Sequence, residues 1–401
     1  MSQSSTPSSS PAQPQGNALA LALATIGFGI NFWAWALLSP LATSFVERGV
    51  VQDTALLVAT PVLVGSLGRI PIGALTDRFG GRLMFPLISL LTVIPVLFIG
   101  FLGLNSYPML LLGAFFLGIS GTTFAIGVPY VNSWYPKEKR GGALGIYGLG
   151  TGGTAIAAFT TVHLTQSISP QAPFVAVAIA LTIYAIVGYA LMRNSPAWAP
   201  SQGSLFSGAA AAAKLKVTWQ AAYLYALSFG GYVAFSVYLP VYLVNAYDLD
   251  KADAALRMGG FVIVAVLARP IGGMLSDRFG AVQMTILTAS ATTAMALVLA
   301  LMPTLTHVGT VAFLVMGAAL GAGSGAVFAL IGKVTEPKMV GAVTGFVGAS
   351  GGLGGFVPPL ILGALWNAQG SYSLGLVLLA VFSGIAVAVA VWVGRDAARA
   401  A

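Results

Sequence analysis

Long apolar runs, separated by short polar segments, constrain the fold of this chain more than any other feature. From residue 18 onward the sequence divides at charged and turn residues into twelve such runs. A helix needs about 20 mainly apolar residues to cross a bilayer. Only 7% of the 401 residues are charged, whereas a soluble domain carries about 25%. The sequence therefore predicts an all-α membrane protein with twelve transmembrane helices, held in the lipid bilayer.

The predicted helices form two groups of six. They cover residues 18–44, 53–76, 83–103, 108–134, 142–164, 171–192, 219–247, 254–276, 282–302, 309–332, 342–366 and 371–393. The longest polar interruption predicts a central cytoplasmic loop, so the expected domains are six-helix bundles at 18–192 and 219–393, joined by the loop 193–218. A Ser/Pro/Gln-rich segment predicts a disordered tail at 1–17, and 394–401 is expected to be a C-terminal tail.

Basic residues mark one side of these helices. With the N-terminus inside, thirteen of the eighteen Lys and Arg residues fall in inner loops, and the outer segments hold Arg48, Lys251 and Arg257. Such an excess marks the cytoplasmic side. We expect a multi-pass protein of the inner (cytoplasmic) membrane, with both termini in the cytoplasm. The net charge of +8 is spread over these loops, so we expect no nucleic-acid partner.

Residue types that carry enzyme chemistry are scarce. The chain has no cysteine and two distant histidines, His163 and His307, so neither a thiolate nucleophile nor a metal site is expected. No Ser/His/Asp set is evident, and the Gly-Lys-Val-Thr segment at 332–335 lacks P-loop spacing. We expect no enzyme activity, no catalytic residue and no cofactor, and we expect a monomer.

An internal repeat relates the two groups. The segment GRIPIGALTDRFGGR (68–82) matches ARPIGGMLSDRFGA (268–281) at a shift of 200 residues, which pairs Arg69 with Arg269. The same shift pairs Gly141, Gly145, Gly148 and Gly152 with Gly341, Gly345, Gly348 and Gly352. Two motifs with one offset indicate duplicated halves, and transporters built in this way bind substrate between their halves near the midplane.

The two paired arginines are predicted to lie inside the membrane. Arg69 precedes the cytoplasmic Asp77 by eight residues, which places it about 12 Å deeper in a helix. An arginine near the bilayer centre costs at least about 2.5–3.5 kcal/mol. All ten carboxylates of the chain fall at or near predicted loops. A structural role, with backbone or hydroxyl partners, remains open. The missing counter-ion favours an anionic substrate, because the planar guanidinium engages oxyanions in bidentate fashion.

Both copies of the G-x-x-x-D-R-F-G segment resemble the loop motif of the major facilitator superfamily. They carry Gly73, Asp77 and Arg78 in the first half and Gly273, Asp277 and Arg278 in the second, and we expect these residues to act in gating. Two glycine-rich helices, GGALGIYGLGTGGTAIAAF (141–159) and GAVTGFVGASGGLGGFVPPL (341–360), add a narrower likeness. Close helix packing explains such glycines in part. Together with the two arginines, they resemble the nitrate/nitrite porter family, which implies two pseudo-symmetric six-helix bundles.

The resemblance also implies site residues. Arg69 and Arg269 would bind the anion, with Phe124 as one aromatic wall, Phe328 as the other, and Tyr225 as a hydrogen-bond donor. Gly148 and Gly348 would allow close approach of the substrate. The family's first signature usually has an asparagine where this chain has Thr151, and Ser350 could compensate from the second signature.

The expected function is secondary active transport of nitrate and/or nitrite by alternating access, with the anion bridged by Arg69 and Arg269. Obligatory exchange and coupling to protons both remain open. The alternative is a transporter of another small anion, such as formate or oxalate.

Overall fold

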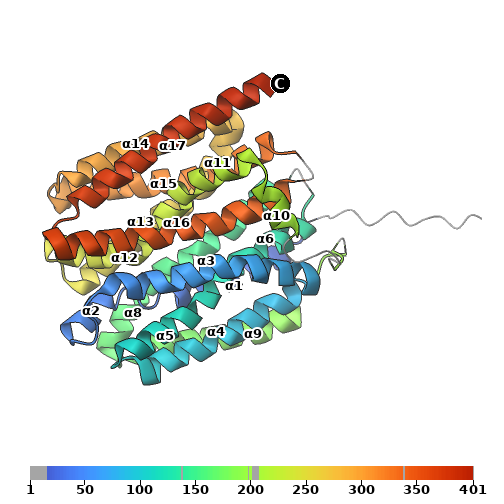
Figure 1. Cartoon of the computed structure of the whole chain (residues 1–401). Helices are drawn as coiled ribbons and strands as arrows, with labels where there is room; N and C mark the ends of the chain where they lie inside the picture. Colours follow the sequence, from blue (N-terminus) through green and yellow to red (C-terminus); the bar gives the residue numbers. More distant parts are fainter. Residues whose placement is uncertain (1–15, 137–138, 197, 201–206, 337–338, 401) are drawn as a thin grey trace, which may run out of the picture.

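The computed structural model describes residues 16–136, 139–196, 198–200, 207–336 and 339–400. All regular secondary structure in these ranges is helical, and the helices run side by side along one direction (Figure 1). Eleven of the helices in the described ranges are long and apolar enough to cross a membrane. The prediction of an all-α, multi-pass membrane fold is confirmed.

The first half contains six membrane-crossing segments. They are α1 (Ala18–Trp35), α3 (Thr54–Phe79), α4 with η1 (Gly81–Phe98, Ile99–Gly103), α5–η2–α6 (Tyr107–Leu117, Gly118–Thr122, Thr123–Trp134), α7–η4–α8 (Arg140–Gly148, Leu149–Gly152, Gly153–Ser167) and α9 (Ala172–Leu191). The short α2 (Ala42–Glu47) lies between α1 and α3. The run predicted at 142–164 is present as α7–η4–α8, but its many Gly and Thr residues make it less apolar, and it is the one predicted run that is not among the eleven apolar spans of the described residues.

The second half repeats this order. Its segments are α11–η5–α12 (Lys216–Tyr225, Ala226–Gly230, Gly231–Tyr247), α13 (Lys251–Phe279), α14 (Ala281–Ala300), η6–α15 (Leu305–Gly309, Thr310–Val334), α16 (Val340–Gln369) and α17 (Ser373–Ala400). Two details differ from the expected boundaries. The central segment contains the short helix α10 (Ser207–Ala213), and α17 continues to Ala400 through residues assigned to a tail. The segment 394–400, GRDAARA, is rich in Ala and Arg, which favour helix, so α17 continues beyond the apolar run.

Caps and glycines define several helix ends. The side chains of Asn17, Asp53 and Asp250 accept hydrogen bonds from backbone N–H groups at the starts of α1, α3 and α13, as N-caps do. At the other end, Gly80 (φ 80°) and Gly280 (φ 97°) terminate α3 and α13. Since positive φ favours glycine, these residues explain the glycine that closes each D-R-F-G motif.

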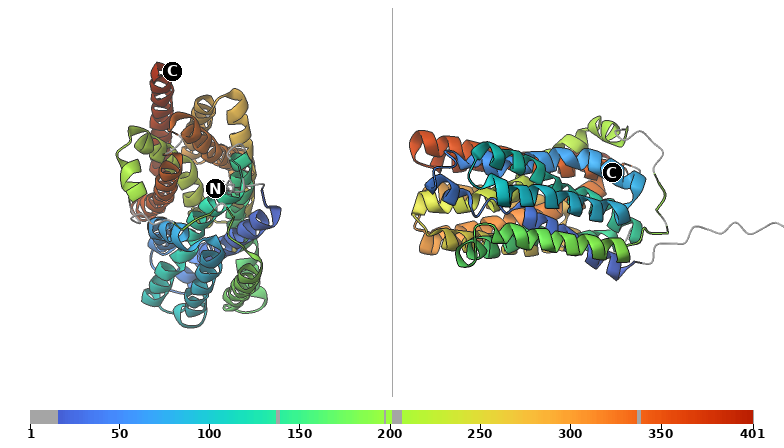
Figure 2. Two further views of the ribbon diagram at one scale, coloured as in Figure 1. Left: turned by 90° about the vertical axis from the view of Figure 1, so that its right-hand side faces the viewer. Right: turned by 90° about the horizontal axis from the view of Figure 1, so that it is seen from below.

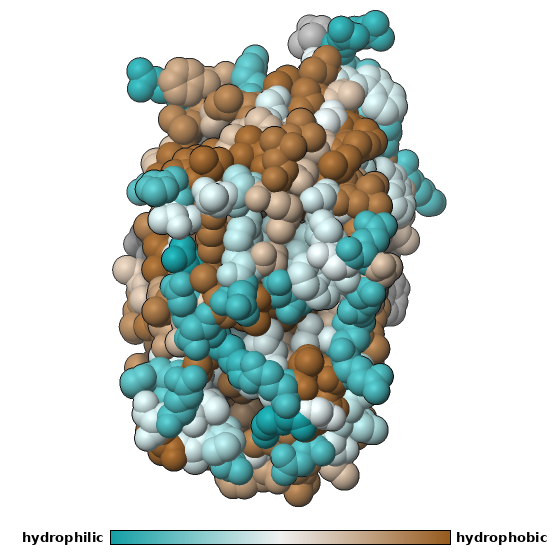
Figure 3. Space-filling model, turned by 90° about the vertical axis from the view of Figure 1, so that its left-hand side faces the viewer, coloured by the Kyte–Doolittle hydropathy of each residue, from teal (hydrophilic) through white to brown (hydrophobic). Residues whose placement is uncertain are grey.

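The outer end is defined here as the end that carries α2 and the turn between α12 and α13, at the left of Figure 1. The inner end carries Gly80, Gly280 and the end of α17. The helix α1 begins and α17 ends at the inner end (Figures 1 and 2). Seen from the outer end, hydrophilic residues cover much of the surface, and the described part shows no wide opening (Figure 3).

Contacts between the halves close the outer end. The Lys251 ammonium forms an ion pair with Glu47, and the Ser39 hydroxyl donates to the carbonyl of Val237. A Cβ added at Gly363 of α16 would lie 2.6 Å from the Cβ of Ala55 in α3, so these helices touch there.

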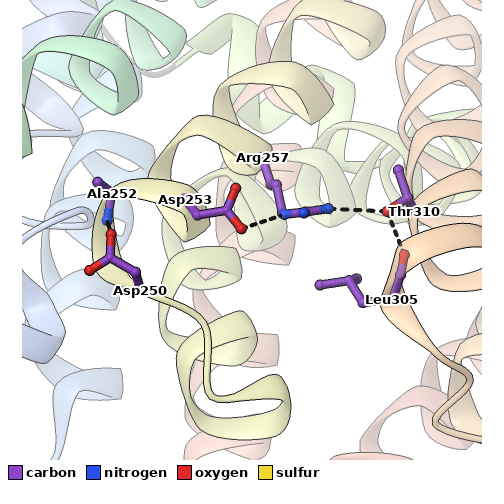
Figure 4. Close-up of polar contacts among 6 residues, drawn as sticks. All are labelled: Asp250, Ala252, Asp253, Arg257, Leu305 and Thr310. Carbon is purple, nitrogen blue, oxygen red and sulfur yellow. Dashed lines mark hydrogen bonds and ion pairs between the residues drawn. The ribbon is translucent and has the colours of Figure 1, made fainter.

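A polar chain anchors the start of α13 within the second half (Figure 4). Arg257 Nε donates to Asp253 at 3.0 Å, and Arg257 Nη1 donates to Thr310 Oγ1 at 3.3 Å. The Thr310 hydroxyl in turn donates to the carbonyl of Leu305 at 2.6 Å. This chain ties α13 to η6 and α15, and therefore holds the outer turn of the helix that carries Arg269.

Candidate functional site

Three membrane-crossing segments lose regular α-helical geometry at one depth. A 3₁₀ turn at Gly118–Thr122 precedes Phe124, a second at Leu149–Gly152 contains Thr151, and a π-helical turn at Ala226–Gly230 contains Phe229. Such turns shift the direction of the following side chains and are frequent at functional sites. They surround the two paired arginines.

Arg69 lies in the middle of α3 and is 6% exposed. Its Nη1 donates to the carbonyl of Gly348 at 2.6 Å, and its Nε lies 3.5 Å from the carbonyl of Gly121. Because Gly348 belongs to α16, this arginine bridges the two halves. A guanidinium has five N–H donors, so these contacts leave donors for a ligand.

Arg269 occupies the matching position in α13 and is 8% exposed. Its Nη2 donates to the hydroxyl of Tyr225 at 2.8 Å. No ion pair between described residues includes either arginine. The structure therefore brings together two buried cations whose partners are carbonyls, a hydroxyl and aromatic faces.

The two guanidinium groups share aromatic neighbours. Arg69 lies 5.0 Å and Arg269 5.9 Å from the centroid of Phe124. Phe328 lies 5.9 Å from Arg269 and is stacked on Phe124 at 6.5 Å between centroids. The three aromatic residues predicted for the site, Phe124, Tyr225 and Phe328, thus lie together around the arginines.

Phe229 is a further ring at the centre of this group, and it belongs to none of the predicted site residues. The Arg69 and Arg269 guanidinium carbons lie 5.3 and 5.2 Å from its centroid. Its ring is parallel to that of Tyr225, with centroids 5.1 Å apart. The signal available in the sequence was the spacing, because a residue four positions after Tyr225 lies on the same helix face.

The predicted glycines lie against the arginine pair. A Cβ at Gly148 would be 3.5 Å from Nε of Arg269, which is ordinary contact. A Cβ at Gly348 would be 3.1 Å from Phe124. Both positions keep the backbone close to the site, and Gly348 also supplies the carbonyl that accepts from Arg69.

The two hydroxyl residues predicted for the site are turned toward their own helices. Thr151 is buried, and its Oγ1 donates to the carbonyl of Gly148 at 2.8 Å. Ser350 donates to the carbonyl of Phe346 at 3.1 Å. Thr151 lines a small cavity beside Arg269 and Phe229, whereas no contact between described residues brings Ser350 to either arginine.

The predicted gating residues lie at the inner end. Asp77, Arg78, Asp277 and Arg278 are exposed, and none of them forms an ion pair with another described residue. Each arginine instead lies over the neighbouring phenylalanine, Phe79 or Phe279. Close helix contact would be one way for Gly73 and Gly273 to act in gating. In this structure a Cβ at Gly73 meets Ala125 at 3.7 Å, and one at Gly273 meets nothing within 4 Å.

A close contact between helix backbones lies instead between α13 and α15. Cβ atoms added at Gly317, Gly321 and Gly325 would lie 2.9 Å from the ring of Phe261, 1.9 Å from the carbonyl oxygen of Ala265 and 2.1 Å from that of Arg269, respectively. The spacing of four residues on both helices forms a ladder of close contacts, which fixes the backbone of Arg269.

The arrangement can hold a small anion. The two cations flank shared aromatic faces, and the remaining guanidinium donors can bind oxygen atoms from two sides. The site is buried, so its electrostatic interactions are stronger than in water. Among the described residues there is no cluster of His, Cys, Asp or Glu that could hold a metal ion.

Comparison with known proteins identifies the protein family to which the chain is similar. The family model of the Major Facilitator Superfamily matches residues 21–359 and 250–401. The chain is 42% identical over 354 residues to "Probable nitrate/nitrite transporter NarK2" of Mycobacterium tuberculosis (strain ATCC 25618 / H37Rv), covering 87% of this chain and 90% of the relative. It is 35% identical over 367 residues to "Nitrite extrusion protein" of Bacillus subtilis (strain 168), covering 90% and 91%.

Solved structures share the fold. A bacterial homologue of the human lysosomal transporter Spinster, in an inward-facing and unoccupied conformation, superposes with a TM-score of 0.73 at 18% identity, covering 95% of this chain and 98% of that one. The occupied form gives a TM-score of 0.71 at 17% identity, covering 94% and 97%.

Proposed function

Because the chain belongs to the nitrate/nitrite porter family of the major facilitator superfamily, we propose that it carries nitrate and/or nitrite across the inner membrane by alternating access. The anion is bridged by Arg69 and Arg269, with Phe124 and Phe328 as aromatic walls and Tyr225 beside it. The observation that carries the proposal is the convergence of two buried guanidinium groups on the same rings, with no carboxylate partner among the described residues.

Electrostatics supports an anion at this place. The separation of the guanidinium carbons is at most the sum of their distances to the Phe229 centroid, 5.3 and 5.2 Å. Two charges so placed repel by at least about 1.5 kcal/mol at an effective dielectric constant of about 20. A monovalent anion at about 5 Å from both would gain about 3 kcal/mol from each. The attraction exceeds the repulsion, so a bound anion stabilises the closed site.

This balance between arginine repulsion and anion attraction couples anion binding to the movement of the two halves. An empty site leaves two like charges facing each other and resists closure, whereas an occupied site closes and allows the halves to rock. The residues of the D-R-F-G turns would then form the inner gate, and both termini would lie in the cytoplasm. Exchange of nitrate for nitrite follows most simply from this logic, and proton-coupled nitrate uptake is the other mode to be tested.

The decisive experiment is uptake of labelled nitrate into proteoliposomes loaded with nitrite. Arg69→Lys and Arg269→Lys keep the charge but lose the planar fork, so each is expected to lower uptake at least ten-fold. Arg48→Lys is the matched control, because Arg48 also combines a carbonyl contact, to Leu104, with a phenylalanine face, but at the outer end. Normal uptake by both site variants would refute the assignment of the anion ligands.

Two further measurements separate the remaining alternatives. Counterflow with and without an imposed pH gradient distinguishes exchange from proton coupling, because only the latter responds to the gradient. Competition of nitrite, formate and oxalate against labelled nitrate tests the substrate class, and stronger competition by formate or oxalate would favour a carboxylate transporter.

A further inference from the structure

A buried tyrosine joins the two halves directly beside the arginine pair. Tyr232 lies in α12 and is 3% exposed. Its hydroxyl lies 3.3 Å from the carbonyl oxygen of Thr151 and 3.2 Å from Oγ1 of Thr154. Both threonines are buried and belong to the first half, so this hydrogen bond crosses the interface between the halves.

The bond lies immediately on the outer side of the site. Tyr232 follows Phe229 by three residues, and the two ring centroids are 5.9 Å apart. Three residues of helix correspond to about 4.5 Å toward the outer end. Tyr232, Thr151, Phe229 and Arg269 also line one small cavity, with room for about one water molecule.

From this geometry we infer that Tyr232 is a positioning residue that couples the arginine site to the outer closure. Its hydroxyl holds α12 against η4 and α8 while the outer side is closed, and it keeps Phe229 and Thr151 in place beside Arg269. The inference rests on the proposed alternating access. It predicts that this hydrogen bond breaks when the site opens to the outside.

Other contacts between the two halves lie farther toward the outer end than the Tyr232 hydrogen bond. Farther outward, α12 meets the first half again at Val237, whose carbonyl accepts from Ser39, and α13 meets α8 where a Cβ at Gly259 would lie 2.4 Å from Phe159. Outward opening must separate all of these contacts. Tyr232 is the closest to the site among them, so its hydroxyl forms the last of these contacts that an anion or water arriving from outside must pass before it reaches the arginines.

The test uses the absence of cysteine from the chain. Ala55 is 1% exposed and faces Gly363 of the other half near the outer end, so A55C reports outward opening through its reaction with a membrane-impermeant thiol reagent. The experiment measures the labelling rate from outside in nitrate-free buffer. Tyr232→Phe retains the ring but removes the hydroxyl, and we expect labelling to become roughly two- to ten-fold faster, as for the loss of one neutral hydrogen bond.

Two controls keep the outcome specific. Tyr223→Phe removes a hydroxyl that donates to Phe382 within the same half at 2.9 Å, and it is expected to leave the rate unchanged. A second reporter, A185C, replaces an alanine of α9 that is 2% exposed within the first half, so general destabilisation would accelerate its labelling too. In a Thr154→Val background the effect of Y232F should shrink, because the two groups share one interaction.

Equal labelling of A55C with and without Y232F, or equal acceleration of A185C, would overturn the inference. Because the measurement involves neither nitrate nor transport, it can succeed when the anion assignment fails. Conversely, normal nitrate uptake by the arginine variants would refute the proposed site while leaving this result intact.

Discussion

Gly325→Ala is the substitution whose effect on the site can be worked out most directly. A Cβ at this position would lie 2.1 Å from the carbonyl oxygen of Arg269 and 2.9 Å from the backbone nitrogen of Gly273. Both are backbone atoms of α13 and cannot rotate away. Relief to an ordinary contact requires the two helices to separate by about 1 Å, and such overpacking costs about 1–3 kcal/mol.

The displacement acts on Arg269, which is one of the two proposed anion ligands. Arg269 donates to Tyr225 at 2.8 Å, and a shift of about 1 Å takes this hydrogen bond beyond its useful range. A hydrogen bond to a charged group contributes about 1.5–3 kcal/mol, so we expect nitrate affinity to fall by about ten-fold or more. Uptake into nitrite-loaded proteoliposomes and thermal unfolding of the purified protein, each with and without nitrate, measure the two effects.

Gly332→Ala provides the matched control. It lies on the same helix, and a Cβ there meets nothing within 4 Å, so uptake and the unfolding temperature should stay at the wild-type values or rise slightly because alanine favours helix. If G325A and G332A prove indistinguishable in both assays, the close contact between α13 and α15 does not position Arg269.

Two other perturbations have expected outcomes. Phe229→Leu removes the ring that lies near both guanidinium groups; each cation–π contact contributes about 0.5–2 kcal/mol, so the unfolding temperature should fall and nitrate should bind several-fold more weakly. Phe229→Tyr should retain most of the stability, and equal losses in both variants would mean that the ring is not the cause. Glu47→Gln breaks the ion pair with Lys251 at the outer end, where the Glu47 side chain is 61% exposed. Since exposed pairs contribute about 0–1 kcal/mol, uptake should change by less than about five-fold and the difference should vanish at high salt; a larger loss would reveal a dominant outer gate.

The fold and the two buried arginines could be predicted from the sequence, because the lipid bilayer allows few interpretations of a long apolar run or of an arginine inside one. In lipid, a long apolar run folds as a helix, because its backbone N–H and C=O groups must be hydrogen-bonded within the segment. An arginine inside such a run is costly, and its recurrence at a shift of 200 residues could not be accidental. Arg69 and Arg269 are accordingly found buried at equivalent places.

Apolar site residues could not be predicted in the same way. In a soluble helix, polar positions reveal which face is buried, but in a membrane helix an aromatic residue is stable against lipid as well as against protein. Phe229 therefore carried no mark except its spacing from Tyr225. The glycines illustrate the same limit. In the glycine-rich helix 141–159, a Cβ at Gly153 would lie 1.9 Å from the carbonyl oxygen of Gly29 in α1, as close helix packing predicts. The backbone of α13, which carries Arg269, instead meets Gly321 and Gly325 of α15, which lie outside both glycine-rich helices.

Contacts between the halves were the least predictable part, and their weakness has a physical reason. Packing within a half can be very close: in the second half, Gly321 and Gly325 meet backbone atoms of α13 at distances no side chain could occupy. A transporter must, however, exchange two packings of its halves that differ by only a few kcal/mol. The interface therefore relies on separable contacts, such as the Tyr232 hydroxyl on Thr151 and the exposed pair of Glu47 and Lys251. Such contacts must break as well as form when the halves move. No single pattern of burial or charge along the chain therefore identifies the residues that make them.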